Sequence, residues 1–266
     1  MKKIFIAGCT FLSIGLVQAQ QKQGTVTYER IVQMQIRLND MPAGIEQHIP
    51  RTRTDKFELV FGNNQSLWKA AEQDNDNDNM SGGDGVQIRM IVSGSDDVLY
   101  NNFTSSRSVE ERNVMDKKFI IVDSIRSLKW KMTGETKTIL NMPAMKSTTT
   151  NISTRMMMNM DNGKMERKEV QDTANITAWF TTSIPVSAGP AEYQGQLPGL
   201  ILEMDVNNGR QTFKATSISE KADLAVIKEP AGKKQYTPAE FRKERDKMME
   251  EMQRNNQGGN RVIRMN

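Results

Sequence analysis

The longest regular feature of the chain is an alternation of apolar and polar residues that begins at residue 26. Every second residue up to position 38 is apolar except Arg30, and the apolar members are Val26, Tyr28, Val32, Met34, Ile36 and Leu38. Successive side chains of a β-strand point to opposite faces, so this pattern predicts a long strand with one buried face. Alternation at 57–61 and 86–92 predicts two more strands, and a continuous apolar run predicts another at 119–122.

Turn residues separate these segments. Asp161-Asn162-Gly163 and Asn207-Asn208-Gly209 predict tight hairpins, because Asn and Gly accept the positive φ that such turns need, and Gly134-Glu135 is a weaker third signal. The polar segments 38–54 and 72–85 are expected to be surface connections. We therefore predict an all-β, mainly antiparallel domain over residues 23–227.

The last part of the chain has a different pattern. Thr237-Pro238-Ala239-Glu240 reads as a capping box with proline at the first helical position, and helix-forming residues follow to Gln253. Gly258-Gly259 predicts that the helix ends before the terminus. Residues 228–266 are thus expected to be a linker and one C-terminal α-helix with a flexible end. Phe241, Met248 and Met252 give that helix a thin apolar stripe, which either docks on the sheet or meets a partner.

The N-terminus resembles a secretory signal. Lys2 and Lys3 precede a mostly apolar stretch, and Val17-Gln18-Ala19 fits a cleavage site, so we interpret residues 1–19 as a signal peptide. Cys9, the only cysteine, would leave with it; lipidation at Cys9 is disfavoured because too little apolar sequence precedes it. The protein is expected to be exported, and to be periplasmic or associated with the outer membrane.

Composition narrows the function classes. The chain has 266 residues, with 36 basic and 32 acidic side chains and no dense basic block, which disfavours nucleic-acid binding. No apolar run beyond the signal is long enough for a transmembrane helix. His48 is the only histidine, so the chain has few residues from which a Ser-His-Asp or Cys-His catalytic site could be built. We expect a non-enzymatic protein without a cofactor.

The most distinctive segment is 178–204, which closes on Leu197-Pro198-Gly199-Leu200-Ile201. Prolines lock φ and remove backbone donors, so the segment is not a central strand throughout. One interpretation is a corner loop that plugs the end of the β core. The other is a preformed rim that presents side chains to a ligand or protein; the candidate binding residues are Trp179, Pro190, Tyr193, Leu197, Pro198, Gly199 and Leu200.

Two alternatives involve chemistry. Met156, Met158 and Met160 share one face of a predicted strand, and thioethers suit Cu(I), although methionine also fills irregular cores. Glu203 and Asp205 share a strand face at a spacing within the range of glycosidase carboxylates, although such pairs usually form a polar face. Asp74, Asp76 and Asp78 resemble the start of a calcium loop but lack its glycine and closing glutamate.

Residues 195–201, Gly-Gln-Leu-Pro-Gly-Leu-Ile, resemble the signature of the GLPGLI family of exported Bacteroidetes-type proteins. The preceding Ala-Trp-Phe, Ile-Pro and Gly-Pro steps match the same pattern, as do Gly24-Thr25-Val26-Thr27-Tyr28, Trp130-Lys131-Met132 and the Thr-Pro-Ala-Glu helix start. The chain departs from it at Gln196, which splits the usual Gly-Leu, and at 140–145, where members often carry a cysteine.

The family has no established biochemical function. Its related domains resemble open, bowl-shaped β structures, and one relative precedes a glycan-releasing amidase as an accessory domain. The resemblance therefore implies a curved open sheet, half-barrel or bowl-like. We hypothesise a binding or accessory module that offers a concave surface to a hydrophobic ligand, a glycan or an outer-membrane protein.

Overall fold

The computed structural model describes residues 22–33, 52–71, 80–81, 87–88, 97–114, 117–161 and 164–257. For residues 80–81, 87–88, 155–161, 164–169, 252–253 and 255–257 it describes the backbone alone. The predicted signal peptide at 1–19, Cys9, His48 and the Asp74–Asp78 alternation lie outside the described residues.

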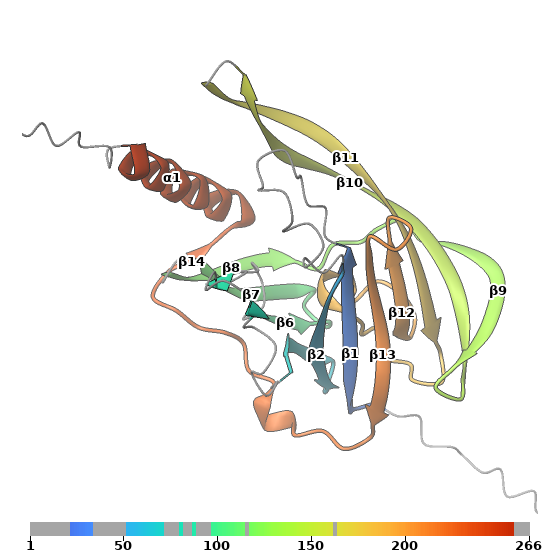
Figure 1. Ribbon diagram of the computed structural model, residues 1–266. Coiled ribbons are helices and arrows are strands. Elements are labelled where there is room, and N and C mark those ends of the chain that lie inside the picture. The colour runs from blue at the N-terminus through green and yellow to red at the C-terminus, as the bar shows by residue number, and fades with distance from the viewer. Residues whose placement is uncertain are drawn as a thin grey trace, which may run out of the picture.

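Twelve strands of the described chain form one open sheet, shown in Figure 1. Their order is β14-β8-β7-β6-β3-β2-β1-β13-β12-β11-β10-β9, and every neighbouring pair is antiparallel except β14 with β8. The edge strands β14 and β9 do not pair with each other, so the sheet does not close into a barrel. This confirms the predicted fold class of a mainly antiparallel open sheet with a C-terminal helix.

The strands have the following bounds: β1 (Gly24–Gln33), β2 (Thr52–Gly62), β3 (Gln65–Ala70), β6 (Val98–Asn102), β7 (Arg107–Val114), β8 (Lys117–Ser124), β9 (Lys131–Ile139), β10 (Met142–Asp161), β11 (Lys164–Thr181), β12 (Leu200–Val206), β13 (Gln211–Ser219) and β14 (Gln235–Tyr236). A separate two-stranded pair consists of β4 (Met80–Ser81) and β5 (Gln87–Ile88). The segment expected as a linker thus contributes β14 to the main sheet.

Strand β1 explains the alternation that opens the sequence. Val26 and Tyr28 are fully buried, and β1 lies between β2 and β13. Arg30, the polar exception, donates to Asp55 at 2.8 Å and lies over the ring of Phe57 at 4.6 Å. Its charge is therefore paired on a face that is otherwise apolar. The predicted continuation at 34–38 lies outside the described residues.

Other strand predictions have mixed outcomes. The predicted strands at 57–61 and 119–122 fall inside β2 and β8 and are confirmed. Of the strand predicted at 86–92, only Gln87–Ile88 is described. The loop predicted for 38–54 is wrong at its end, because residues 52–54 pair with the outer end of β1 and begin β2.

The hairpin turns predicted from Asn and Gly residues also have mixed outcomes. Asn207, Asn208 and Gly209 have φ values of 57°, 53° and 85° and join β12 to β13, as predicted. Asp161 pairs with Lys164 across the β10–β11 hairpin, whose two central residues are outside the description. The turn expected at Gly134-Glu135 is wrong: Gly134 lies inside β9 with φ of 82°, and the turn from β9 to β10 is at Leu140-Asn141.

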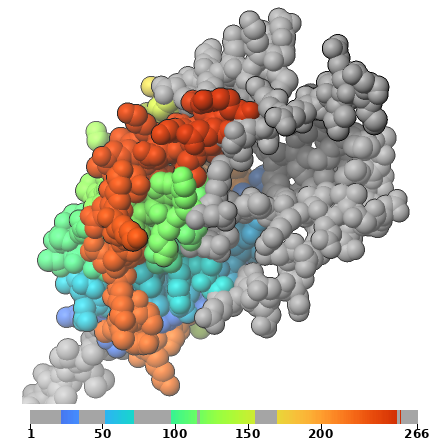
Figure 2. Space-filling model, turned by 90° about the vertical axis from the view of Figure 1, so that its left-hand side faces the viewer, coloured from blue at the N-terminus to red at the C-terminus, as the bar shows by residue number. Residues whose placement is uncertain are grey.

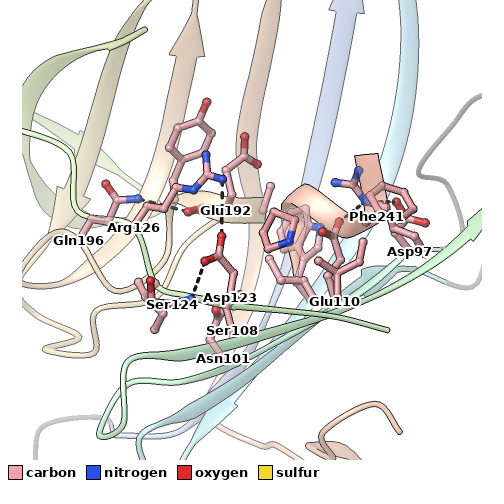
Figure 3. A pocket seen from close by; sticks show the side chains of 18 of the residues that line it. Asp97, Asn101, Ser108, Glu110, Asp123, Ser124, Arg126, Glu192, Gln196 and Phe241 are labelled. Carbon is pink, nitrogen blue, oxygen red and sulfur yellow. Dashed lines mark hydrogen bonds and ion pairs between the residues drawn. The ribbon is translucent and has the colours of Figure 1, made fainter. Parts of the chain in front are cut away.

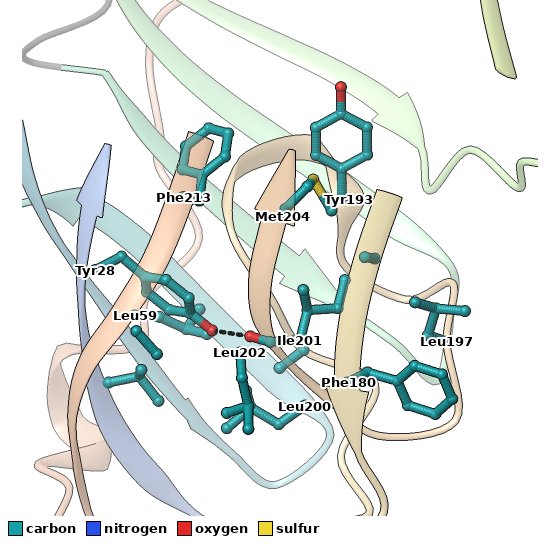
Figure 4. Close-up of a cluster of buried hydrophobic side chains, with 14 of the residues drawn as sticks. Tyr28, Leu59, Phe180, Tyr193, Leu197, Leu200, Ile201, Leu202, Met204 and Phe213 are labelled. Atoms are coloured by element: carbon teal, nitrogen blue, oxygen red, sulfur yellow. Dashed lines mark hydrogen bonds between the residues drawn. The ribbon is translucent and has the colours of Figure 1, made fainter. Parts of the chain in front are cut away.

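The core forms where the sheet encloses one of its own connections. Side chains from β1, β2, β11, β12 and β13 pack against residues 182–199, which we call the plug loop and which includes the short 3-10 helix η2 (Ala191–Tyr193). Figure 4 shows this cluster, with the hydroxyl of Tyr28 donating to the carbonyl of Ile201 at 2.5 Å. A single curved sheet thus buries its apolar face without a second sheet.

Helix α1 (Pro238–Gln257) begins at the predicted capping box. The Thr237 amide donates to Glu240 at 2.8 Å, and the Glu240 amide donates to the Thr237 hydroxyl at 3.3 Å. Phe241 is buried against Phe119 and Ile121 of β8, and Met248 packs at the edge of this cluster. Figure 2 shows the helix (red) lying over β8 (green). The apolar stripe therefore docks on the sheet at Phe241 and Met248.

Candidate functional site

The plug loop turns most of the predicted binding residues toward the core. Tyr193, Leu197 and Leu200 are buried, as are Pro190 and Gly199, whereas Trp179 is half-buried on β11 and Pro198 is exposed. Among these residues, only Tyr193 also lines the pocket described below. The loop therefore acts as the predicted plug, and one of its faces also forms part of a pocket wall.

The glycine of the Leu-Pro-Gly-Leu turn is required for a steric reason. The Gly199 amide donates to the Leu197 carbonyl at 2.8 Å, and the Leu200 amide donates to the Ile184 carbonyl at 3.1 Å. A Cβ at position 199 would lie 2.1 Å from the carbonyl oxygen of Thr181. Glycine is required here because two backbone segments approach too closely for a side chain. The sequence alone is compatible with two reasons for this glycine, a positive φ or a close approach of another segment.

A pocket of about 540 Å³ lies beside the plug loop (Figure 3). Its lining comes from β1–β3, β6–β8, the segment after β8, the middle of β10, the plug loop and the first turns of α1. Nine of the lining residues are charged, which makes the site polar: Arg30, Asp97, Glu110, Arg112, Asp123, Arg126, Glu192, Arg242 and Arg245.

Most of these charged side chains form ion pairs with one another. Arg112 contacts Glu110 at 2.7 Å and Asp97 at 3.5 Å, and it lies over the ring of Phe241 at 5.5 Å. Arg126 contacts Asp123 at 3.5 Å, an ion pair drawn in Figure 3. Five of the nine charged side chains therefore have an ion-pair partner within the pocket lining.

Asn101 of β6 adds a donor that the protein does not use. Its side chain lines the pocket and the residue is 3% exposed, yet its amide nitrogen Nδ2 has no hydrogen-bond partner among the described residues. An unsatisfied buried donor costs about 1–3 kcal/mol of stability. A buried donor of this kind calls for an acceptor from water, an ion or a ligand, or for a rearrangement of its surroundings.

Glu192 stands on the wall that η2 forms. Glu192 is exposed to solvent, and desolvation by the neighbouring protein raises the pKa of its carboxyl group; the charge of Glu110 acts in the same direction. Arg112 and Arg126 partly offset the shift. Burial also raises the pKa of the neighbouring Tyr193 hydroxyl. A carboxyl group with a raised pKa in a concave site is a candidate for function.

Gln196, which departs from the GLPGLI signature that the sequence resembles, connects three segments. Its side-chain oxygen accepts from the Leu128 amide at 3.2 Å and from the Trp130 indole at 3.0 Å, and its Nε2 donates to the Glu192 carbonyl at 3.2 Å. The extra residue thus fastens the pocket wall to the segment before β9. Sequence reasoning noted the insertion without assigning it this role.

Gln194 fastens the same wall to the sheet. It is buried, and its side-chain oxygen accepts a hydrogen bond from Ser66 of β3 at 2.6 Å. Ser66 in turn pairs with Asn101 across β3 and β6. The Ser66–Gln194 hydrogen bond therefore joins the plug loop to the strand next to the one that carries Asn101.

The carboxylate pair of the hydrolase hypothesis, Glu203 and Asp205, lies outside the pocket lining. Glu203 contacts Lys137 at 2.5 Å, while Asp205 accepts from the Gly209 amide at 2.9 Å in the turn after β12. The Glu203 pair lies by Trp179, whose ring is 4.3 Å from the Lys137 Nζ. These two carboxylates thus have structural partners and do not line the pocket.

Met156, Met158 and Met160 alternate along β10, but their side chains lie outside the described residues, so copper binding stays a prediction. Within the described chain, no cluster of three His, Cys, Asp or Glu side chains is placed to hold a metal. In that same part of the chain, no helix is long and apolar enough to cross a membrane.

Comparison with known proteins gives a family without an assigned activity. A family model described as a protein of unknown function (Porph_ging) matches residues 130–203, which run from Trp130 through the plug loop into β12. The family is Bacteroidetes-associated, and the GLPGLI name stays a prediction. No curated protein matches the chain.

One solved structure, titled "Structure of PNGF-II in C2 space group", is similar with a TM-score of 0.47 and 17% identity. The alignment covers 81% of this chain and 30% of the other, so this chain spans less than a third of that protein's length.

Proposed function

We propose that this protein is an exported, non-catalytic binding module that holds a small polar ligand in the pocket beside the plug loop. The observation that carries the proposal is the unpartnered Asn101 amide on the wall of a cavity of about 540 Å³. Ligand pockets typically measure about 300–1,000 Å³ and use a few fixed polar groups for specificity. The pocket has the size and the spare donor that such binding requires.

The lining favours a polar ligand over an apolar one. Nine charged side chains surround the cavity, and an apolar ligand would remove them from water without replacing their hydrogen bonds. Trp68 and Phe57 stack at a centroid distance of 4.9 Å and are 5% and 2% exposed. Their ring faces are therefore used within the protein. Of the ligand classes expected from sequence, the hydrophobic one is the least compatible with this site.

The ion pairs support recognition rather than bond-making. Arg112 contacts Glu110 at 2.7 Å, so its charge is oriented within the pocket before a ligand arrives. Preorganised groups of this kind lower the cost of ordering on binding. The signal-like sequence of residues 1–19 supports export, and the proposed binding step is therefore in the periplasm or at the outer membrane.

A ligand screen with two proteins tests the proposal. The wild-type protein and Asn101→Leu are scanned by thermal unfolding against a chemically diverse set of amino acids, peptides, sugars and organic acids. A ligand at 100 times its Kd adds about 2.7 kcal/mol of stability. In a domain of this size that is a rise of roughly 5–11 °C in Tm.

We expect at least one polar compound to raise the Tm of the wild type and to lose that effect in Asn101→Leu. Asn101→Ala serves as a second variant in case leucine does not fit. Absence of any saturable ligand, or binding that both variants retain, refutes the proposal. Turnover of a bound compound refutes its non-catalytic part.

A further inference from the structure

The hairpin of β10 and β11 is longer than the sheet that carries it. Strand β9 pairs with β10 only over residues 142–148, and β12 pairs with β11 only over residues 176–181. Beyond these limits, and among the described strands, residues 150–161 and 164–175 pair only with each other. Figure 1 shows this arm extending past the rest of the sheet. Because a two-stranded ribbon is only marginally stable in water, the arm is a candidate for pairing with a further strand.

The two strands of the arm differ in charge. Segment 150–161 has two charged residues among twelve, Arg155 and Asp161. Segment 164–175 has six among twelve, namely Lys164, Glu166, Arg167, Lys168, Glu169 and Asp172. Charged residues on an edge strand hinder its pairing with another chain. The outer edge of β10, which faces away from β11, is therefore the edge of the arm that is suited to accept a strand.

Ile152 lies on this weakly charged strand. Its side chain is 67% exposed, the highest value among the large apolar residues of the described chain. Its neighbours Ser153 and Thr154 are exposed and small, and Thr173 is its partner on β11. Single exposed apolar residues are common, but a strand added at the outer edge of β10 would give this one a cross-strand neighbour.

A second copy of the same segment fits this edge. In an isologous dimer the two strands run antiparallel about a twofold axis, so the segment must be complementary to itself. Residues 150–159 contain a single charged residue, Arg155. A register with Arg155 opposite Thr154 of the second copy aligns all ten residues and keeps the two arginines from lying directly opposite each other, where like charges destabilise a sheet.

The length of the segment is sufficient for an interface. An antiparallel pair of ten residues makes roughly ten backbone hydrogen bonds, because every second residue pair exchanges two. A typical protein–protein interface carries about ten direct hydrogen bonds. The same register places Ile152 opposite Met157 of the second copy, so the pairing includes an apolar contact on each side of the twofold axis.

We propose that residues 150–159 of β10 pair antiparallel with the same residues of a second copy, so that the two sheets join at the arm. The occupant of the outer edge is thus another molecule of this protein. The inference goes beyond ligand binding in the pocket and does not depend on it. Asn151 also lines the pocket, but the pairing uses the backbone groups of the strand edge and needs no bound ligand.

Sedimentation velocity tests the inference on the protein produced with its own N-terminal sequence, from micromolar to hundreds of micromolar concentration. We expect a shift from monomer to dimer as the concentration rises. A protein that stays monomeric over this range overturns the inference. So does growth into larger assemblies, because an isologous contact closes at two copies.

A matched pair of lysine variants tests the edge. Ile152→Lys adds a charge to the proposed contact in both copies, and we expect it to weaken dimerisation at least about tenfold. Thr173→Lys adds the same charge at the position opposite Ile152 but on β11, and it should dimerise like the wild type. Thr154→Lys is a second contact variant in case the first does not fold. A dimer that is unchanged in the folded contact variants, or weakened equally by Thr173→Lys, contradicts the assignment.

Amide hydrogen exchange gives a readout of the segment itself. Exchange in residues 150–159 should slow at protein concentrations that populate the dimer, because their outward-facing amides gain partners. Segment 164–175 should gain less protection, since its outer edge stays unpaired in the dimer. Protection in 150–159 that is no greater than in 164–175 refutes the proposed pairing.

Discussion

Substitution of Gly199 by alanine tests why the plug loop needs glycine. The new Cβ would lie 2.1 Å from the Thr181 oxygen and 2.8 Å from the Thr181 carbonyl carbon, whereas ordinary contact begins at 3.4 Å. The two segments would have to separate by more than 1 Å, roughly the shortfall in this contact, and overpacking of this kind typically costs about 1–3 kcal/mol and sometimes more. Thr181 is fully buried and pairs with Leu200, so the backbone has little room to move. We expect a loss of at least about 3 kcal/mol, the upper part of that range.

Chemical denaturation of the wild type and Gly199→Ala measures this loss, and thermal unfolding should show a fall in Tm of about 6–12 °C. Gly134→Ala is the matched control. Its Cβ would have no neighbour within 4 Å, but its φ of 82° is unfavourable for alanine, at a cost of about 1–2 kcal/mol. Gly199 is not among the glycines with positive φ, so the pair separates a steric clash from backbone strain. A loss at Gly199 no larger than that at Gly134 would refute the steric explanation.

Three further predictions each concern a single residue. Tyr28→Phe removes the buried hydrogen bond to the Ile201 carbonyl and should lower the free energy of unfolding by about 1–3 kcal/mol in urea denaturation; an unchanged value would show that this bond contributes no net stability. The hydrogen bonds from Thr237 lower the pKa of Glu240, so their contribution is present at neutral pH and is lost as the pH falls through the lowered pKa. An NMR titration of the Thr237 amide should follow that loss, and a flat titration contradicts it. Desolvation by the neighbouring protein raises the pKa of Glu192, so wild-type stability should fall as the pH rises from the ordinary pKa to the raised one; Glu192→Gln should lack this fall, and an identical pH profile contradicts it.

Local patterns predicted much of the sheet because they depend on neighbouring residues. The alternation at Val26 and Tyr28 places one face of β1 in the core, and Asn207-Asn208-Gly209 forms the turn that its composition favours. Gly134 shows the limit of this reasoning. Its positive φ suits a hairpin turn equally well, but the pairing of β9 with β10 places it inside a strand.

The pocket could not be predicted, because its residues are brought together only by the order of the strands. Asn101 and Glu192 look like ordinary polar residues in sequence, and only the fold brings both to the lining of one pocket. Two local signals were available. Arg30 interrupts an otherwise apolar row, and Gln196 interrupts the expected motif; one lines the pocket, and the other both lines it and fastens its wall.

The plug loop has two faces, and this decides how variants in it should be interpreted. Leu197 and Gly199 pack into the core, while Glu192 and Gln196 line the pocket a few residues away. Because the same short segment carries both, a change in the Leu-Pro-Gly-Leu turn would also displace the pocket wall. Loss of binding in such a variant therefore does not show that the motif contacts a ligand. Only substitutions that do not lower the Tm, as is expected of Glu192→Gln, can assign a ligand contact to this loop.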